Sequence, residues 1–297
     1  MRVDDREPFP AWGRHPAHCL GQVWHLLKLD PVSGTGTTLA FVSTVADITS
    51  ALAQKTKPEN AATWDPVGLQ LGDPTSEVET VAVCHEVTEA VVARLENRPV
   101  DLLVTYHPLL FAPVNRLVSG RSAEARAFRL IRAGVSLVVS HTDFDVASGG
   151  TADALADLYR LRDVEPFGGD EDDDVPSIGR VGEFEGTVGV LDAMTSDRFG
   201  ANGLRITGDR ERNVDRVAVV PGSGSDFIEK AAVVADALVT GDVSHHRAVR
   251  ARDLGLAIID PGHVATERPG MKALARLVEE VAGLTMDLTD LDPTTWS

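Results

Sequence analysis

The sequence predicts an α/β fold with two similar α/β halves built around mixed sheets. Short apolar runs that are typical of buried strands alternate with amphipathic stretches of helical period. This alternation occurs twice, from about residue 44 to 160 and again from about 216 to 281, and an acidic run at 168–174 separates the two series. Strands that alternate with helices in this way form sheets with helices packed against them, which defines the α/β class.

The first half opens on a helical pattern, because Val45, Ile48 and Leu52 are spaced three and four residues apart. Apolar runs rich in Val and Leu follow it, and each is succeeded by a longer amphipathic stretch. The expected elements are strand 78–84, helix 88–97, strand 102–105, helix 122–133, strand 136–140 and helix 152–160.

The second half begins with short β-like pieces and then repeats the alternation of strand and helix. The β-like pieces are 182–185, 187–191 and 204–207. The expected series is strand 216–220, helix 226–235, strand 237–240, helix 244–254, strand 256–259 and helix 266–281. No strict internal sequence repeat accompanies the similarity of the two halves.

Composition shifts suggest where the halves begin and end. Residues 1–41 mix prolines and glycines with isolated apolar residues and show no sustained period, so we expect a poorly ordered leader without chemistry. The first half then covers 42–167, an acidic linker 168–175 and the second half 176–297. Since no Met lies between Met1 and Met194, a native start near Val42 would need a non-Met codon. Mass spectrometry of the native N-terminus distinguishes that start from Met1.

Composition also limits the class of protein. With 297 residues, 43% of them hydrophobic and 25% charged, the chain resembles an ordinary globular protein. No run approaches the ~18 uncharged apolar residues of a membrane helix. The first residues are also acidic where a secretion signal would be basic. We therefore expect a cytoplasmic protein without membrane contact.

The formal net charge of -17 repels phosphate backbones and argues against broad nucleic-acid binding. Scattered acidic residues also improve solubility without implying any ligand. The two cysteines, Cys19 and Cys84, stand in unrelated contexts, so neither a disulfide framework nor a cysteine zinc motif can be drawn. A metal site in this chain would have to use histidine and carboxylate.

Three polar clusters follow the ends of expected strands. Ligands bind at the carboxyl ends of strands in open α/β sheets, so clusters from distant parts of the chain could converge on one crevice. The clusters are Thr105-Tyr106-His107-Pro108, His141-Thr142-Asp143-Phe144-Asp145 and Pro261-Gly262-His263-Val264-Ala265-Thr266-Glu267.

Four residues of these clusters could bind one divalent metal centre. His263 and Glu267 are four residues apart at the start of an expected helix, so their side chains can share one face. Adding His107 and Asp145 gives a mixed nitrogen and oxygen set that suits zinc, manganese or iron(II). Taken singly, a histidine after a strand is more often a surface or core residue, and an aspartate there is often a helix cap. The metal hypothesis depends on their convergence.

Two further patterns have simpler explanations. Gly222-Ser223-Gly224 follows an expected strand and could cradle an anion, but a tight turn explains the glycines as well. His245-His246 opens an expected helix, where packing or support of a neighbouring ligand is the simpler role.

Five separated motifs occur in order between about Thr44 and the C-terminus. Together they resemble the Nif-three-like family, also known as GTP cyclohydrolase I type 2 homologues or dinuclear-metal-centre hexameric proteins. The motifs are Trp64-Asp65-Pro66-Val67-Gly68-Leu69-Gln70-Leu71-Gly72, Tyr106-His107-Pro108-Leu109-Leu110-Phe111, His141-Thr142-Asp143-Phe144-Asp145, Thr240-Gly241-Asp242-Val243-Ser244-His245-His246 and Gly262-His263-Val264-Ala265-Thr266-Glu267.

The resemblance implies a toroidal homohexamer with two metal ions in each subunit. The family's ligand positions fall here on Tyr106, His107, Asp145, His263 and Glu267. Tyr106 stands where the first residue of a His-His pair is usual.

A phenol has a reference pKa of about 10 and must usually ionise to bind a metal well. One of the two centres should therefore lose affinity, and the expected content is one or two ions per subunit. His85 precedes Glu86, the position where relatives tend to carry an aspartate. His85 itself is expected to be a surface residue at a strand end, and whether it compensates for Tyr106 is left open.

Two functions of different classes are consistent with these residues. One is metal-assisted hydrolysis of a nucleotide or phosphate ester, with His141 as a positioning residue or proton shuttle. The name of the family suggests GTP ring opening, although the sequence contains no base-recognition motif. The alternative is a non-enzymatic protein that binds or delivers metal, or docks a partner through the hexamer. A third alternative is that the metal site has lost its function and only the hexamer is retained.

Overall fold

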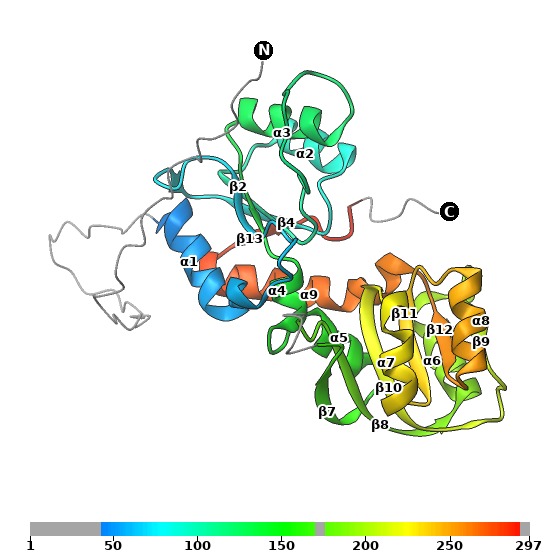
Figure 1. Ribbon diagram of the computed structural model, residues 1–297. Coiled ribbons are helices and arrows are strands. Elements are labelled where there is room, and N and C mark those ends of the chain that lie inside the picture. The colour runs from blue at the N-terminus through cyan, green and yellow to red at the C-terminus, as the bar shows by residue number, and fades with distance from the viewer. Residues whose placement is uncertain (1–42, 170–175, 292–297) are drawn as a thin grey trace, which may run out of the picture. The chain divides into compact units, whose positions relative to one another are not determined.

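The computed structural model describes residues 43–169 and 176–291 (Figure 1). The leader expected at 1–41 and most of the expected acidic linker lie outside these residues. One sheet has five strands, of which four are parallel and the last is antiparallel. In spatial order they are β13 (Thr285–Asp287), β4 (Val81–Cys84), β5 (Leu102–Thr105), β6 (Ser136–Val139) and β2 (Gly68–Leu71). A separate pair joins β1 (Ser43–Thr44) and β3 (Glu77–Val78).

Both faces of the five-stranded sheet are covered, so its central strands are hydrophobic throughout. Successive side chains of a strand point to opposite faces. In β4, Ala82 and Cys84 therefore pack with α2 (Glu89–Asn97) and α3 (Ala123–Arg132), whereas Val81 and Val83 pack on the other face. The helices of that other face are α1 (Val45–Thr56) and α9 (His263–Ala282).

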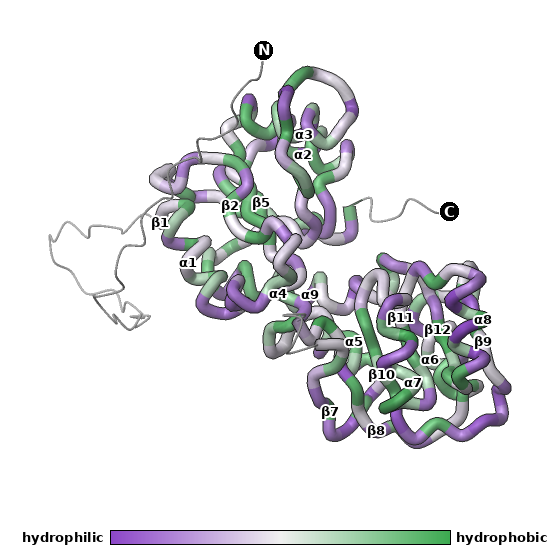
Figure 2. Tube along the Cα trace, in the orientation of Figure 1, coloured by the Kyte–Doolittle hydropathy of each residue, from purple (hydrophilic) through white to green (hydrophobic). Residues whose placement is uncertain are grey.

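A second sheet has six strands, with β10, β11 and β12 parallel and the other pairs antiparallel. Alternate residues of its central strands are again buried on opposite faces, and Figure 2 shows the hydrophobic residues (green) along β10. In spatial order the strands are β7 (Arg162–Phe167), β8 (Gly179–Thr187), β10 (Asn213–Ser223), β11 (Ala237–Gly241), β12 (Ala257–Asp260) and β9 (Arg205–Thr207). The helices that pack on it are α5 (Thr151–Leu158), α6 (Val188–Phe199), α7 (Ile228–Val234) and α8 (His245–Asp253).

Helix α9 begins three residues after β12 and ends three residues before β13 of the five-stranded sheet. Its residues Met271, Leu274 and Val278 are buried in the core beneath β4 and β5. Helix α5 packs closely against it, because a Cβ at Gly270 would lie 2.6 Å from Cγ2 of Thr151. The same helix therefore contributes to both sheets, and its packing on them fixes where its first turn lies.

The structure confirms the predicted α/β class with mixed sheets. The strand expected at 187–191 is wrong, because Thr187 caps a helix there: its hydroxyl accepts a hydrogen bond from the Val190 N–H at 3.3 Å. Strand β7 was not expected, since five of its six residues are exposed on a sheet edge and give no apolar signal. The division of the chain into halves at 168–175 stays a prediction, although β7 and β8 pair across it.

Shorter elements were also absent from the expectations. They are β1, β2, β13, α4 (Thr142–Val146) and the 3₁₀ helices η1 (Pro58–Asn60) and η2 (Ser225–Phe227). Within the described ranges, no helix combines the length and the apolar composition that a membrane span requires.

Leu274→Ala tests the contribution of α9 to the five-stranded half. Leu274 is fully buried, so we expect the free energy of unfolding to fall by about 2–5 kcal/mol, measured by urea denaturation. Leu284→Ala is the control, because Leu284 is 92% exposed and its loss should change stability by less than about 0.5 kcal/mol. Equal losses in the two variants would contradict the packing of α9 against the five-stranded sheet.

Candidate metal centre

Three parallel strands end at one group of aromatic side chains. His85 directly follows β4, Tyr106 directly follows β5, and His141 lies two positions beyond the end of β6. Backbone hydrogen bonds extend the pairing past the strands, because the N–H of Tyr106 donates to Cys84 O at 3.1 Å and that of His107 to His85 O at 2.9 Å. The strand ends therefore present these rings at the same edge of the sheet, where ligands bind in such folds.

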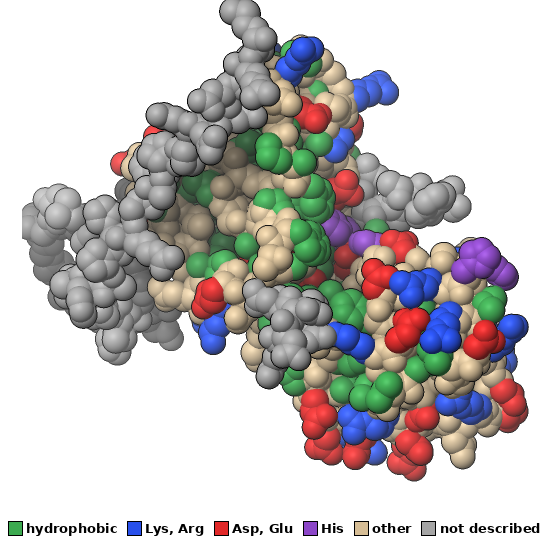
Figure 3. Space-filling model, viewed as in Figure 1, with side chains coloured by type: hydrophobic (Ala, Val, Ile, Leu, Met, Phe, Trp, Pro, Cys, Tyr) green, Lys and Arg blue, Asp and Glu red, His purple; other side chains and the backbone are tan. Residues whose placement is uncertain are grey.

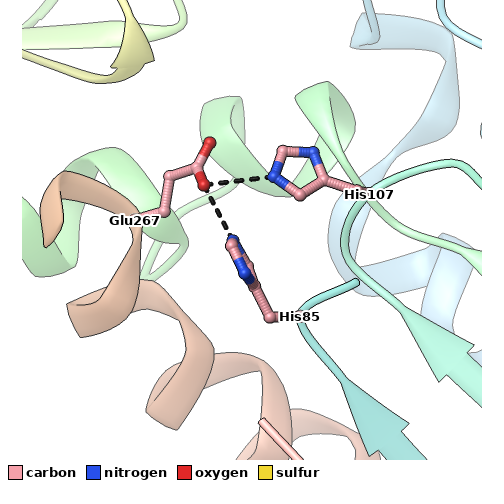
Figure 4. A group of neighbouring side chains, drawn as sticks. All are labelled: His85, His107 and Glu267. Carbon is pink, nitrogen blue, oxygen red and sulfur yellow. Dashed lines mark hydrogen bonds and ion pairs between the residues drawn. The ribbon is translucent and has the colours of Figure 1, made fainter. Parts of the chain in front are cut away.

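The carboxylate of Glu267, in the second turn of α9, lies at the centre of the group. The residue is only 2% exposed. Its Oε2 is 2.8 Å from Nε2 of His85 and 3.2 Å from Nε2 of His107 (Figure 4). Its Oε1 is 3.0 Å from Nε2 of His263.

Burial works to raise the pKa of Glu267, but the charges and hydrogen bonds of the surrounding histidines hold this pKa well below its usual value. The side chain is thus an ionised carboxylate held among three imidazoles. The three imidazoles offset the free energy that is lost when a charged carboxylate is removed from water.

His263 is the most accessible imidazole of the cluster. Its side chain is 34% exposed, and its Nδ1 lies 2.7 Å from Oδ2 of Asp242, which follows β11. Burial lowers the pKa of His263, but the hydrogen bonds to Glu267 and Asp242 outweigh this effect and raise it to about 9. In Figure 3 histidine atoms (purple) reach the surface beside acidic atoms (red).

Two glycines let the second sheet approach the centre. Gly222 in β10 has a φ of +67°, and a Cβ there would lie 2.7 Å from Oε1 of Glu267 and 3.3 Å from Nε2 of His263. Its N–H donates to the Thr266 hydroxyl at 2.9 Å. A Cβ at Gly241 would lie 2.5 Å from the backbone nitrogen of His263. Because they lack a side chain, Gly222 and Gly241 therefore allow the ends of β10 and β11 to lie close to the start of α9.

Tyr106 and Asp145 form a second buried pair. The Tyr106 hydroxyl donates to Oδ1 of Asp145 at 2.6 Å, and the residues are 1% and 5% exposed. Burial and the neighbouring charges of Asp145 and Glu267 raise the pKa of Tyr106 well above its ordinary value, so the phenol keeps its proton. Burial also raises the pKa of Asp145, to about 7, against the opposing effects of His141 and the Tyr106 hydrogen bond.

His141 is oriented by a buried aspartate. Its Nδ1 lies 2.9 Å from Oδ2 of Asp65, whose side chain has no exposed surface. The same oxygen accepts hydrogen bonds from the backbone N–H and the hydroxyl of Thr142 at 3.0 and 2.5 Å. Burial lowers the pKa of His141, but its hydrogen bond to Asp65 and the nearby carboxylates raise it above the ordinary value. Asp65 of the first motif thus holds His141 and Thr142 of the third motif in place by hydrogen bonds.

The donor set fits a divalent metal ion. His85, His107 and Glu267 each offer one ligand atom, and these atoms lie within 4.8 Å of one another. Two atoms bound to one zinc ion lie at most about 4.2 Å apart, so the distances of 2.8 and 3.2 Å from Glu267 to the two imidazoles are compatible with a shared ion. Imidazole and carboxylate together suit zinc, iron or manganese.

The structure brings three of the predicted ligands into direct contact, namely His107, His263 and Glu267. Asp145 and Tyr106 bind each other beside them, and the ring of His141 lies 5.1 Å from that of His107. Whether these residues bind metal stays a prediction.

The expectation that His85 is a surface residue is wrong, because the side chain turns inward and is 4% exposed. Sequence reasoning also missed Asp65, Gly222 and Asp242 as neighbours of the site. All three belong to motifs that are visible in the sequence, but only the fold shows what they contact.

These features define an α/β protein with a buried carboxylate and histidine centre at the carboxyl edge of a parallel sheet. The chain belongs to the family described as Duf34/NIF3 (NGG1p interacting factor 3), which matches residues 43–293. This match confirms the resemblance drawn from the motifs.

Curated relatives and solved structures support the same family and the same fold. The chain is 37% identical over 210 residues to a "GTP cyclohydrolase 1 type 2 homolog" of Lactococcus lactis, covering 69% of this chain and 80% of the relative. It is 33% identical over 246 residues to one of Streptomyces coelicolor, covering 80% and 86%.

Among solved structures, "Reduced HcgD from Methanocaldococcus jannaschii" has a TM-score of 0.72 and 26% identity, covering 83% of this chain and 98% of that one. A Bacillus cereus protein related to NIF3 has a TM-score of 0.76 at 19% identity, covering 87% and 99%, which shows the shared fold.

Gly222→Ala tests the close approach of β10 to the carboxylate. We expect the variant to bind Zn²⁺ at least about tenfold more weakly in a competition assay, because the new Cβ displaces Glu267 or His263. Gly255→Ala is a matched control: its φ of +76° imposes similar backbone strain of roughly 1–2 kcal/mol, but a Cβ there meets no atom within 4 Å. Equal affinities in the two variants would reject this role for Gly222.

Proposed function

We propose that this chain is a divalent-metal-dependent hydrolase that acts on a nucleotide or another phosphate ester. The observation that carries the proposal is the buried Glu267 carboxylate with three imidazole nitrogens around it. The relatives' printed name, "GTP cyclohydrolase 1 type 2 homolog", supports hydrolysis and a nucleotide substrate. His107, Asp145, His263 and Glu267 would hold the metal, with zinc, manganese and iron as the candidate ions.

When bound, a divalent ion supplies Lewis-acid polarisation and lowers the pKa of water. The chain's own contribution is to orient groups and to carry a proton. His141 is held by Asp65 through Nδ1, so a proton exchanged with the substrate would be carried at Nε2. Thr142 fixes Asp65 in turn, which keeps the imidazole in one orientation.

Two exposed aromatic side chains beside His141 support a substrate with a flat base. Trp64 is 63% exposed and Phe111 55% exposed, although each is a large apolar residue. Their ring centroids lie 6.2 and 6.3 Å from that of His141, in edge-on orientations. Aromatic side chains of this kind stack on bases regardless of base identity. They would place a nucleobase next to the centre.

The proposal includes a homohexamer, as the family resemblance implies, and a location in the cytoplasm, as the composition predicts. The mixture of acidic and basic side chains over α7 and α8 in Figure 3 is consistent with a small-molecule substrate rather than a nucleic-acid backbone. Arg247, for example, pairs with Asp226 and Glu229.

A non-enzymatic role in metal binding or delivery is the second candidate. The accessibility of His263 favours it, because a ligand that is 34% exposed, beside an Asp242 that is 54% exposed, can exchange an ion with the solvent or with a partner. A delivery protein would lose its ion readily to a chelator or acceptor and would turn over no ester.

Glu267→Gln separates the two functions. We expect this variant to lose bound metal, measured by elemental analysis after purification without chelator, and to lose hydrolysis of a panel of nucleotides and phosphate esters. Glu280→Gln on the same helix is the control, since that side chain is 61% exposed and pairs with Lys55 at the surface. If metal-loaded native protein hydrolyses none of these substrates, the hydrolase proposal fails and metal delivery remains.

Phe111→Ala tests the stacking platform. Because stacking of a base on an aromatic ring contributes about 1–3 kcal/mol, we expect KM for a nucleotide to rise about tenfold while kcat changes little. Val118→Ala is the control, as Val118 is another exposed apolar side chain at 64% exposure. An unchanged KM in the Phe111 variant would exclude base stacking on this ring.

A further inference from the structure

His85 is a buried histidine whose polar contacts point to the metal centre. We propose that His85 is a metal ligand and takes the position that the family resemblance gives to Tyr106, whose hydroxyl holds Asp145 instead. The inference rests on the metal binding put forward under the proposed function and adds a ligand that the family resemblance does not imply.

The surroundings of His85 favour ligation over a packing role. Its Nε2 is 2.8 Å from Oε2 of Glu267, so the two atoms are near enough to bind one ion after a small adjustment. Its Nδ1 is buried and has no hydrogen-bond partner within the described part of the chain. Among the described residues, no other polar group therefore competes with the Glu267 carboxylate for this ring. Here the whole polar interaction of the ring is directed at the oxygen that also contacts His107.

Tyr106 is committed to a different contact. Its hydroxyl donates to Asp145 at 2.6 Å, and its ring stacks on that of His85 with centroids 5.7 Å apart and planes 15° from parallel. The ring therefore supports the orientation of His85, and the hydroxyl positions Asp145. Tyr106 acts as a positioning residue and not as a ligand.

The sheet register explains why either of these two strand ends can supply the metal-binding histidine. Cys84 of β4 and Thr105 of β5 are the last paired residues, so His85 and Tyr106 are the next pair along the two parallel strands. Neighbouring residues of paired strands point to the same face, with side chains in contact. A histidine after β4 can therefore offer its imidazole at nearly the same place as a histidine after β5, and the fold stays the same.

The consequence is a centre that holds one ion on His85, His107 and Glu267, with His263 at the second oxygen of the carboxylate. This donor set replaces Asp145 of the set given under the proposed function, because Asp145 is held by the Tyr106 hydroxyl, and it consists of three imidazoles and one carboxylate. Such a set favours zinc and cobalt over magnesium and manganese, which prefer oxygen ligands.

Cobalt titration of the full chain, followed by visible absorption, tests the proposal. We expect the native protein to bind one Co²⁺. His85→Gln should bind at least about 100-fold more weakly, because removal of a ligand exceeds the 10–100-fold cost of removing a group that only supports one. Tyr106→Phe keeps the ring that stacks on His85, so it should keep the visible spectrum and lose less affinity, under about tenfold, than the removal of a whole supporting group costs. His246→Gln is the control, because His246 is exposed and lies outside the cluster.

A second variant guards against misfolding. His85→Cys with Co²⁺ should show a near-ultraviolet thiolate-to-cobalt charge-transfer band, which the native protein should lack although buried Cys84 is adjacent. If the native protein binds Co²⁺ but folded His85→Gln binds it equally well, or if His85→Cys binds it without that band, His85 is not a ligand. If the native protein binds no metal, the proposed function fails as well, so the two failures can be distinguished.

Discussion

The buried carboxylate of Glu267 is the constraint on which the rest of the structure depends. An ionised carboxylate that is 2% exposed is tolerated only when it is paired and hydrogen-bonded. Its three partners come from separate parts of the chain, at the end of β4, after β5 and at the first residue of α9. The burial of this charge is therefore tolerated only because the packing of α9 brings the helix start and the strand ends together.

Helix α9 transmits this constraint to both sheets. Its first turn is held from one side by Gly222, whose N–H donates to Thr266, and its later turns bury Leu274 and Val278 against the five-stranded sheet. The chain then returns along β13, which pairs with β4, the strand that ends at His85. The element that supplies the carboxylate is thus also part of the core that supports the partner imidazole (Figures 1 and 4).

Local sequence signals predicted the alternation of strands and helices and placed His107 and Glu267 at a common edge. The same signals could not show that His85 faces Glu267, because the two are 182 residues apart and their contact depends on the register of β4 and the position of α9. The short run at 187–191 misled for a different reason. Four apolar or small residues fit a strand and a helix equally well, and the cap from Thr187 decides between them. Edge strand β7 gave no signal because its exposed residues need no apolar pattern.

Electrostatics links the metal hypothesis to the substrate hypothesis. Burial raises the pKa of Asp145, and the charge of Glu267 raises it further, which means that the two carboxyl groups are close enough to repel each other as anions. A phosphate ester brought to this edge would meet the same repulsion, in a chain whose formal net charge is -17. Partial neutralisation by His263 offsets one negative charge, but His263 is already paired with both Glu267 and Asp242. In the proposed function a divalent cation would supply further positive charge, which would favour the binding of metal before an anionic ester.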